Sequence, residues 1–292
     1  MTLLEFGIEE FREVKYMAIG GLPNEENGMS AAEIDGFAAR IRSHQGGMIS
    51  AWVGIPDPLL VNHLAQEAFD AVVLDMQHGM WSMPTAANAI GLVRLAGKPA
   101  LARIPVGDFA SASRLLDAGA SGVIAPMINS AEDAKALVRN TKYPPLGERS
   151  WGPSLALNHM GLSADDYLKN ANELTVAIAM IETRAALDAI DGILGVSGID
   201  GIFIGPSDLS IALSNGDQVA PNAAEIDSAM QHAVSRCRAR GKFACAFAGD
   251  GERAGELLKF GFDFVIAGAE TAQLRSGARR AINAARRVAS GS

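Results

Sequence analysis

The chain has 292 residues, of which 49% are hydrophobic, 20% charged and 6% aromatic. It is long enough for one or two domains and apolar enough to bury a large core, which excludes a disordered chain and a small disulfide scaffold. The formal net charge of −8 opposes binding to nucleic acid. Two cysteines are too few for a metal cage or a disulfide framework, so we expect reduced thiols in a cytoplasmic protein. The acidic amino terminus does not resemble a signal peptide, and no apolar run approaches the ~18 residues of a membrane span.

The first 28 residues differ from the rest, because they are half polar and end in a Gly-, Pro- and Asn-rich segment. We expect them to be a peripheral or mobile extension without a catalytic role. Ser30 and Glu33 then have the spacing of a capping box that opens a helix. The predicted organisation is an extension over residues 1–28 followed by a single domain over residues 29–292.

From Gly47 onward, short apolar runs alternate with amphipathic stretches. Such runs are typical of parallel strands buried on both faces, and the alternation predicts βαβ units. Eight units fit a (β/α)8 TIM barrel of the usual ~250 residues. A doubly wound sheet is the alternative, but no G-x-G-x-x-G motif follows any run. The predicted strands are 48–53, 71–74, 100–104, 122–126, 176–181, 201–204, 243–247 and 264–267, and the predicted helices include 58–68, 84–96, 131–140, 185–194, 226–240, 251–260 and 271–288.

Active-site residues of such barrels follow the carboxyl ends of the strands. One histidine, one arginine and several carboxylates occupy these positions and are therefore expected at one mouth of the barrel. The residues concerned are Trp52, Asp75-Met76-Gln77-His78-Gly79, Arg103, Glu182 and Gly205-Pro206-Ser207-Asp208.

Glu182 and Asp208 follow two consecutive predicted strands. Two carboxylates so placed suit one hard divalent cation, Mg²⁺ or Mn²⁺, with most of its coordination sphere open to water or substrate. The alternative is that each acid only begins or caps a helix. The metal site is the interpretation we favour.

His78 shares its loop with Asp75 and Gln77, and histidine exchanges protons near neutral pH, which suits acid–base catalysis. Arg103 interrupts an apolar strand, so it needs a partner. It either stabilises a developing enolate oxygen or forms an internal ion pair with a carboxylate at the mouth. Lys98 and Lys242 precede strands, which places them at the opposite end of the barrel and disfavours a Schiff-base lysine.

Several motifs now stand in one order along the chain, and together the sequence resembles the HpcH/HpaI aldolase family, the class II pyruvate aldolases of the citrate lyase β-like superfamily. The resemblance extends from Gly47 to about Val288. The motifs are Asp75-Met76-Gln77-His78-Gly79, Ala102-Arg103-Ile104-Pro105, Leu115-Leu116-Asp117-Ala118-Gly119-Ala120, Tyr143-Pro144-Pro145-Leu146-Gly147-Glu148-Arg149, Ile181-Glu182-Thr183-Arg184 and Phe203-Ile204-Gly205-Pro206-Ser207-Asp208-Leu209-Ser210.

The resemblance implies a carbon–carbon lyase that cleaves a 4-hydroxy-2-oxo acid to pyruvate and an aldehyde through a metal-stabilised enolate. It implies Glu182 and Asp208 as ligands of Mg²⁺ or Mn²⁺, with Co²⁺ as a further candidate, and no nucleotide or pyridoxal phosphate. Backbone N–H groups of Ser207 and Asp208 would receive the pyruvate carboxylate. Arg103 would stabilise the enolate oxygen and His78 would act as base on the 4-hydroxyl. Asp75 belongs to the same expected catalytic group.

The resemblance also makes Asp117 the partner that raises the basicity of His78. Asp117 ends a helix and precedes a strand, at the opposite end of the barrel, so we expect it to come from a neighbouring subunit of a homo-oligomer, a hexamer built as a trimer of dimers by resemblance. Two residues depart from the family pattern. Gln77 stands where a Glu is common, and Met180, which cannot hydrogen-bond the substrate, stands where a Gln is common.

Three other functions are open for the same barrel. One is a CoA-thioester lyase of the malyl-CoA lyase type, and a second is oxaloacetate decarboxylation, which would not need His78. The third is a degenerate barrel that binds a keto acid without turnover. The aldolase is the function that we favour.

Overall fold

The computed structural model describes residues 36–44 and 46–290, which lie in one compact unit. The predicted extension over residues 1–28 and the predicted capping box of Ser30 and Glu33 lie outside the described residues. The first described helix, α3 (Gly36–Arg42), buries Phe37 and Ile41.

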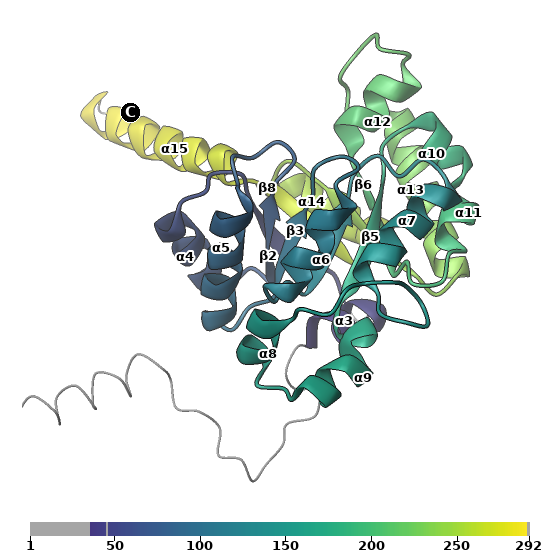
Figure 1. Cartoon of the computed structure of the whole chain (residues 1–292). Helices are drawn as coiled ribbons and strands as arrows, with labels where there is room; N and C mark the ends of the chain where they lie inside the picture. Colours follow the sequence, from purple (N-terminus) through teal and green to yellow (C-terminus); the bar gives the residue numbers. More distant parts are fainter. Residues whose placement is uncertain (1–35, 45, 291–292) are drawn as a thin grey trace, which may run out of the picture. The chain divides into compact units, whose positions relative to one another are not determined.

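Eight parallel strands close into a barrel in which each strand pairs with the next and β8 pairs with β1 (Figure 1). The prediction of a (β/α)8 TIM barrel is therefore confirmed. Every predicted strand is present, and the ends differ by at most two residues. The strands are β1 (Met48–Val53), β2 (Ala71–Asp75), β3 (Ala100–Arg103), β4 (Gly122–Ala125), β5 (Val176–Ile181), β6 (Gly201–Ile204), β7 (Phe243–Phe247) and β8 (Phe264–Ala269).

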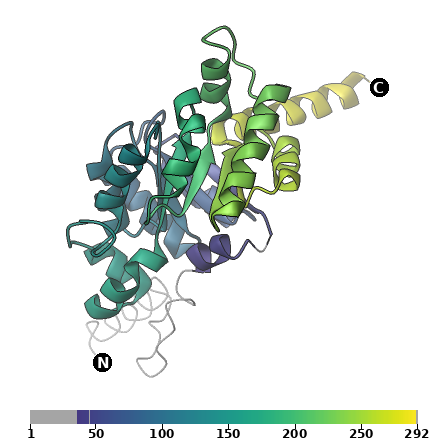
Figure 2. The ribbon, with the colours of Figure 1, turned by 90° about the vertical axis from the view of Figure 1, so that its right-hand side faces the viewer.

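The helices that follow the strands surround the barrel (Figures 1 and 2). Many begin at a Ser, Thr or Asp whose side chain accepts a backbone N–H of the first turn, as Asp57, Ser82 and Asp250 do. They are α4 (Pro58–Gln66), α5 (Met83–Leu95), α6 (Phe109–Asp117), α7 (Ala131–Thr141), α8 (Ser154–Met160), α9 (Ala164–Leu174), α10 (Arg184–Asp188), α11 (Ile190–Leu194), α12 (Pro206–Leu213), α13 (Ala224–Ala239) and α14 (Gly251–Phe260).

One predicted helix is wrong in detail. The stretch over residues 185–194 is two short helices, α10 and α11, because Ala189 leaves the helical conformation with φ −89° and ψ 4°. The helices α8 and α9, which precede β5, were not among the predicted helices.

Side chains alternate along each strand between the barrel interior and the layer beneath the helices. The interior holds one apolar cluster, which includes Trp52, Leu101, Met180 and Phe203. A larger cluster lies between the strands and the surrounding helices. Alternation therefore determines which residues near a strand's carboxyl end face the mouth of the barrel.

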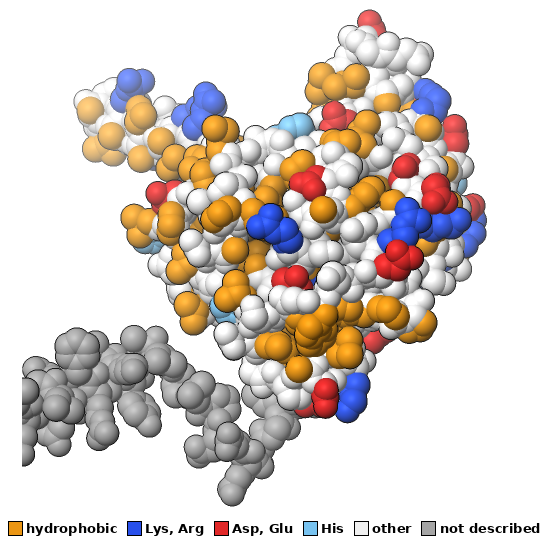
Figure 3. All heavy atoms as spheres, in the orientation of Figure 1, with side chains coloured by type: hydrophobic (Ala, Val, Ile, Leu, Met, Phe, Trp, Pro, Cys, Tyr) orange, Lys and Arg blue, Asp and Glu red, His pale blue; other side chains and the backbone are white. Residues whose placement is uncertain are grey.

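The last helix, α15 (Glu270–Ser290), begins at the end of β8 and extends away from the barrel (Figures 1 and 2). Hydrophobic side chains lie along one side of it and arginines along the opposite side (Figure 3). Leu274, Ile282 and Val288 are 68%, 48% and 79% exposed. Within the described ranges, no helix has the length and apolar character needed to cross a membrane.

Candidate active site

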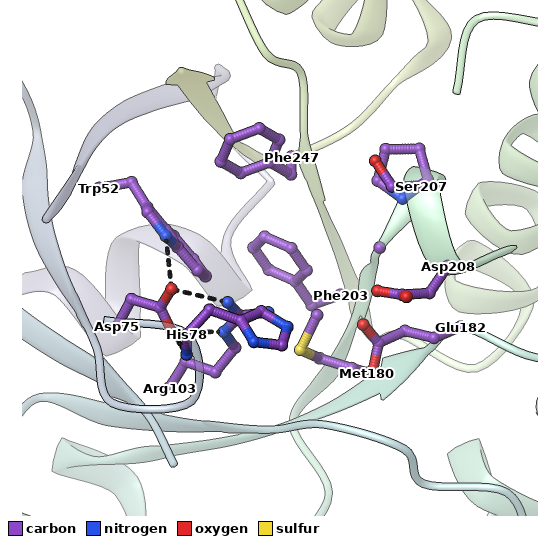
Figure 4. A pocket seen from close by; sticks show the side chains of 12 residues that line it. Trp52, Asp75, His78, Arg103, Met180, Glu182, Phe203, Ser207, Asp208 and Phe247 are labelled. Carbon is purple, nitrogen blue, oxygen red and sulfur yellow. Dashed lines mark hydrogen bonds and ion pairs between the residues drawn. The ribbon is translucent and has the colours of Figure 1, made fainter. Parts of the chain in front are cut away.

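A cavity of about 260 Å³ opens at the carboxyl ends of the strands, where the active sites of (β/α)8 barrels lie. It contains all of the predicted site residues except Gln77 and Asp117. The lining residues are Trp52, Asp75, His78, Arg103, Met180, Glu182, Phe203, Gly205, Pro206, Ser207, Asp208 and Phe247 (Figure 4).

The alternation of the strands explains why the charged residues reach this cavity. Each of three charged residues stands two positions after a side chain of the interior apolar cluster, so its side chain points into the barrel and not toward the helices. The three are Asp75, Arg103 and Glu182. The register of β2 against β3 also places Asp75 directly opposite Arg103. Neighbouring strands therefore bring these opposite charges together.

Asp75 and Arg103 form a buried, two-pronged ion pair. The guanidinium donates from Nε to Oδ1 over 2.8 Å and from Nη2 to Oδ2 over 2.7 Å. Its Cζ lies 4.8 Å from the ring centre of Trp52, whose indole N–H also donates to Asp75. The internal ion pair considered for Arg103 is thus present. Nη1 has no acceptor among the described residues, so this nitrogen is available to a ligand.

Asp75 also organises the loop that contains His78. Its Oδ1 accepts the backbone N–H groups of Gln77 and His78 at 3.1 and 3.3 Å. Burial would raise the pKa of Asp75, but the hydrogen bond and the charge of Arg103 outweigh it and lower that pKa, so the carboxylate is ionised. The imidazole of His78 is exposed at the mouth and has no hydrogen-bond partner among the described residues.

Glu182 and Asp208 approach one another on the other side of the cavity (Figure 4). Glu182 is 1% exposed, and burial raises its pKa to about 7; the N–H of Met127 at 2.9 Å opposes this shift, and the negative charge of Asp208 adds to it. Neither acid is a helix N-cap, because Thr183 caps α10 and Gly205 precedes α12. The N-cap form of the alternative is therefore excluded for both, although Asp208 does lie in the first turn of α12.

The first turn of α12 borders the same acids. Gly205 precedes it without a side chain, so no side-chain oxygen caps the N–H groups there. A methyl group at Gly205 would lie 2.5 Å from Oε1 of Glu182, so only glycine leaves room for that carboxylate. The uncapped turn, which includes Ser207 and Asp208, is suited to an anionic ligand.

Two lysines lie where the sequence predicted, at the opposite end of the barrel. Lys98 donates to the carbonyl oxygen of Phe69, and Lys242 donates to that of Ile199, each over 2.6 Å. These acceptors precede β2 and β6, at the amino ends of the strands.

Two predicted site residues lie outside the cavity. Asp117 ends α6 and pairs with Arg149 over 2.7 Å, beside a separate surface depression of about 280 Å³. Gln77 uses its backbone N–H to bind Asp75, and its side-chain oxygen is buried without a hydrogen-bond partner.

The sequence model of the HpcH/HpaI aldolase/citrate lyase family matches residues 49–277, which is most of the chain. The chain belongs to this family. The matched region includes every residue that lines the cavity. The resemblance noted from the motifs is thereby confirmed.

Several relatives match about four fifths of the chain or more. A hydroxypyruvate/pyruvate aldolase of Rhizorhabdus wittichii is 41% identical over 82% of this chain and 94% of its own length. A 4-hydroxy-2-oxo-heptane-1,7-dioate aldolase of Klebsiella pneumoniae is 33% identical over 79% of this chain and 86% of its own length. The crystal structure of an HpcH/HpaI aldolase from Desulfitobacterium hafniense has a TM-score of 0.78 at 25% identity and covers 86% of this chain and 96% of that one.

Two aromatic lining residues of this HpcH/HpaI barrel, Phe203 and Phe247, were not predicted as site residues. Phe247 lies two positions after Cys245, an interior residue of β7. Their rings lie 5.8 and 5.6 Å from that of Trp52. The alternation of side chains along β6 and β7 predicts that both rings face the cavity. Both residues are apolar, so the polar residues at the strand ends gave no signal for them.

Proposed function

We propose that this protein is a metal-dependent lyase that reversibly cleaves a 4-hydroxy-2-oxo acid into pyruvate and an aldehyde. The proposal rests chiefly on the pairing of buried Glu182 with the more exposed Asp208, at the uncapped start of α12 in the cavity that also holds Arg103 and His78. Relatives named as aldolases, 41% and 33% identical, support the same class of reaction.

The acid pair fits a hard divalent cation. Burial and the neighbouring charge of Asp208 make ionised Glu182 unfavourable, and a cation held by both carboxylates would remove that penalty. We propose Mg²⁺ or Mn²⁺, with Co²⁺ as a further candidate, because carboxylate oxygens prefer such ions. When bound, the cation would supply positive charge that favours the enolate of pyruvate.

The residues of the chain have separate tasks in this reaction. The N–H groups of Ser207 and Asp208 bind the substrate carboxylate. Arg103, held by Asp75, stabilises negative charge that develops on the 2-oxo oxygen. His78 removes the proton of the 4-hydroxyl, the C3–C4 bond breaks, and its electron pair passes to the enolate as the aldehyde leaves. Protonation at C3 yields pyruvate, and the reverse sequence joins the two products.

We propose further that the protein is a homo-oligomer in which Asp117 of one subunit acts on His78 of a neighbour. Asp117 lies outside the cavity of its own chain, while the ring of His78 is exposed. The apolar side of α15 offers surface for such an assembly. Both cysteines are free and buried, in keeping with the cytoplasmic location that we propose.

The test is pyruvate release from a panel of 4-hydroxy-2-oxo acids, after chelation and readdition of Mg²⁺, Mn²⁺ or Co²⁺. We expect activity to return with the cation and to be abolished in Glu182→Ala, but not in Glu132→Ala, whose acid is exposed on α7. Borohydride trapping of pyruvate on a lysine would overturn the metal mechanism. Cleavage of malyl-CoA in preference to free acids would favour the CoA-thioester lyase instead.

A further inference from the structure

Glu270 is the single residue of the described part of α15 that is buried, at 4% exposure. Its carboxylate faces backbone rather than a cation: Oε1 accepts the N–H groups of Gly54 and Ile55, each over 3.0 Å. Burying a carboxylate is costly unless its hydrogen bonds compensate, so this arrangement requires an explanation beyond helix formation.

The pairing of β1 with β8 explains why these N–H groups need a side-chain acceptor. The register shifts between Ser50 and Trp52, and Trp52 is opposite Ala269, the last residue of β8. Val53 at the end of β1, and Gly54 and Ile55 after it, therefore lie beyond the end of the partner strand. Glu270 follows Ala269 directly, and its side chain continues the ladder that the backbone of β8 no longer provides.

The segment that Glu270 holds supports the loop of His78. The carbonyl oxygen of Gly54 accepts the N–H of Met80 over 2.9 Å. Gly79 lies so close that a methyl group there would be 2.7 Å from Gly54 and 2.1 Å from the carbonyl oxygen of Asp75. The loop is thus fixed between two supports, with Asp75 on one side and the end of β1 on the other.

We propose that Glu270 is a positioning residue for His78, acting through the backbone of Gly54 and Met80. This inference rests on the proposed role of His78 as the base. Loss of the acceptor would release the end of β1 and let the loop shift, and a displacement of about 1 Å at a reacting group costs on the order of 100-fold in rate. Glu182 and Asp208 follow other strands, and Arg103 keeps its own two-pronged bond to Asp75, so we expect steps that do not use His78 to be spared.

Two reactions of the same site separate these effects. Cleavage of a 4-hydroxy-2-oxo acid needs His78, whereas oxaloacetate decarboxylation needs only the enolate-stabilising residues, so His78→Ala sets the reference pattern. In Glu270→Ala we expect kcat for cleavage to fall roughly 10- to 100-fold, with decarboxylation within about twofold of wild type. Glu270→Gln should restore cleavage, because its amide oxygen can accept both N–H groups.

Asp70→Ala is the matched control. Asp70 also accepts a β1 backbone N–H, that of Ile49 over 2.8 Å, but at the opposite end of the strand. It should lower stability without changing the ratio of the two activities. Should Glu270→Ala fail to fold, Glu270→Asp, which shortens the reach of the carboxylate, replaces it in the comparison.

Hydrogen exchange of the backbone measured by mass spectrometry gives a readout independent of turnover. We expect exchange in residues 76–81 to rise at least severalfold in Glu270→Ala and to match wild type in Glu270→Gln. Equal losses of both activities, or unchanged exchange in this segment, would overturn the proposal. If the wild type cleaves no 4-hydroxy-2-oxo acid, the proposed function fails, while the exchange measurement still decides the role of Glu270.

Discussion

Arg149 donates from Nη2 to Oδ1 of Asp117 over 2.7 Å, outside the cavity that holds His78. The side chain of Arg149 is fully buried, with its guanidinium 4.6 Å from the ring centre of Tyr143 and 5.9 Å from that of Tyr167. The Asp117 side chain remains 23% exposed. A carboxylate that is oriented by a rigid neighbour and still accessible is well placed to act on another molecule.

The first prediction concerns this pair and the proposal that the active site is shared between subunits. His78→Ala and Asp117→Asn should each lower aldol cleavage, the first by roughly 100-fold or more and the second by roughly tenfold. When the two variants are unfolded together and reassembled, mixed oligomers should recover activity. The reason is that some sites then combine an intact His78 with an intact Asp117 from the neighbour.

Measurement of pyruvate release before and after mixing tests this prediction. Each variant reassembled alone controls for refolding. Absence of recovery in demonstrably mixed oligomers would contradict a site shared between subunits, as would full activity of a dilute, verified monomer.

The second prediction follows from the raised pKa of Glu182. An acid whose pKa is about 7 in the folded protein and 4.5 in the unfolded chain binds more protons when folded, so it lowers stability as pH rises through that window. The stabilisation that Glu182 contributes to the folded protein is complete below pH 4.5 and is lost by about pH 7. The shift of its pKa corresponds to at most about 3 kcal/mol in the free energy of unfolding. A bound cation should cancel this loss.

Thermal unfolding after chelation should therefore show Tm falling between pH 5 and 7 more steeply in wild type than in Glu182→Gln, which cannot ionise. Readdition of Mg²⁺ or Mn²⁺ should raise the Tm of wild type more at pH 7.5 than at pH 5. A cation effect of equal size at both pH values would contradict the assignment of Glu182 as a ligand.

The sequence allowed the barrel to be predicted because parallel strands buried on both faces leave continuous apolar runs. The residues of the mouth could be predicted for a related reason, since they directly follow those runs. The helices α8 and α9 were missed because Pro144, Pro145 and Pro153 and nearby glycines obscure the helical pattern before them.

Other features depend on contacts that no local pattern contains. The ion pair of Asp75 with Arg103 depends on the register of β2 against β3, and the role of Glu270 depends on where β8 ends against β1. The place of Asp117, in contrast, could be predicted from the sequence. Its position at the end of a helix, before a strand, already indicated that it would lie away from the carboxyl ends of the strands, and the structure places it outside the cavity.

The third prediction concerns Met180, which is 1% exposed and lies among apolar side chains of the barrel interior. Met180→Gln places an amide among these apolar side chains, and burying an amide costs free energy unless it is hydrogen-bonded. We expect the free energy of unfolding to fall by roughly 1–3 kcal/mol, whereas Met180→Leu should cost less than about 1.5 kcal/mol. Denaturant unfolding of the two variants compares them. Equal stability of both would show that a partner for the amide already exists.

The fourth prediction uses Gly205 to change the position of Glu182, the proposed metal ligand, while its carboxylate is kept. In Gly205→Ala, the new methyl group would lie 2.5 Å from Oε1 and 2.9 Å from Cγ of Glu182, so the carboxylate must move although both acids remain. Affinity for Mn²⁺, measured by calorimetry, should fall roughly 10- to 100-fold. Gly255→Ala is the control, because a methyl group there meets nothing within 4 Å. Unaltered Mn²⁺ affinity in Gly205→Ala would mean that the orientation of Glu182 is not required for binding the cation.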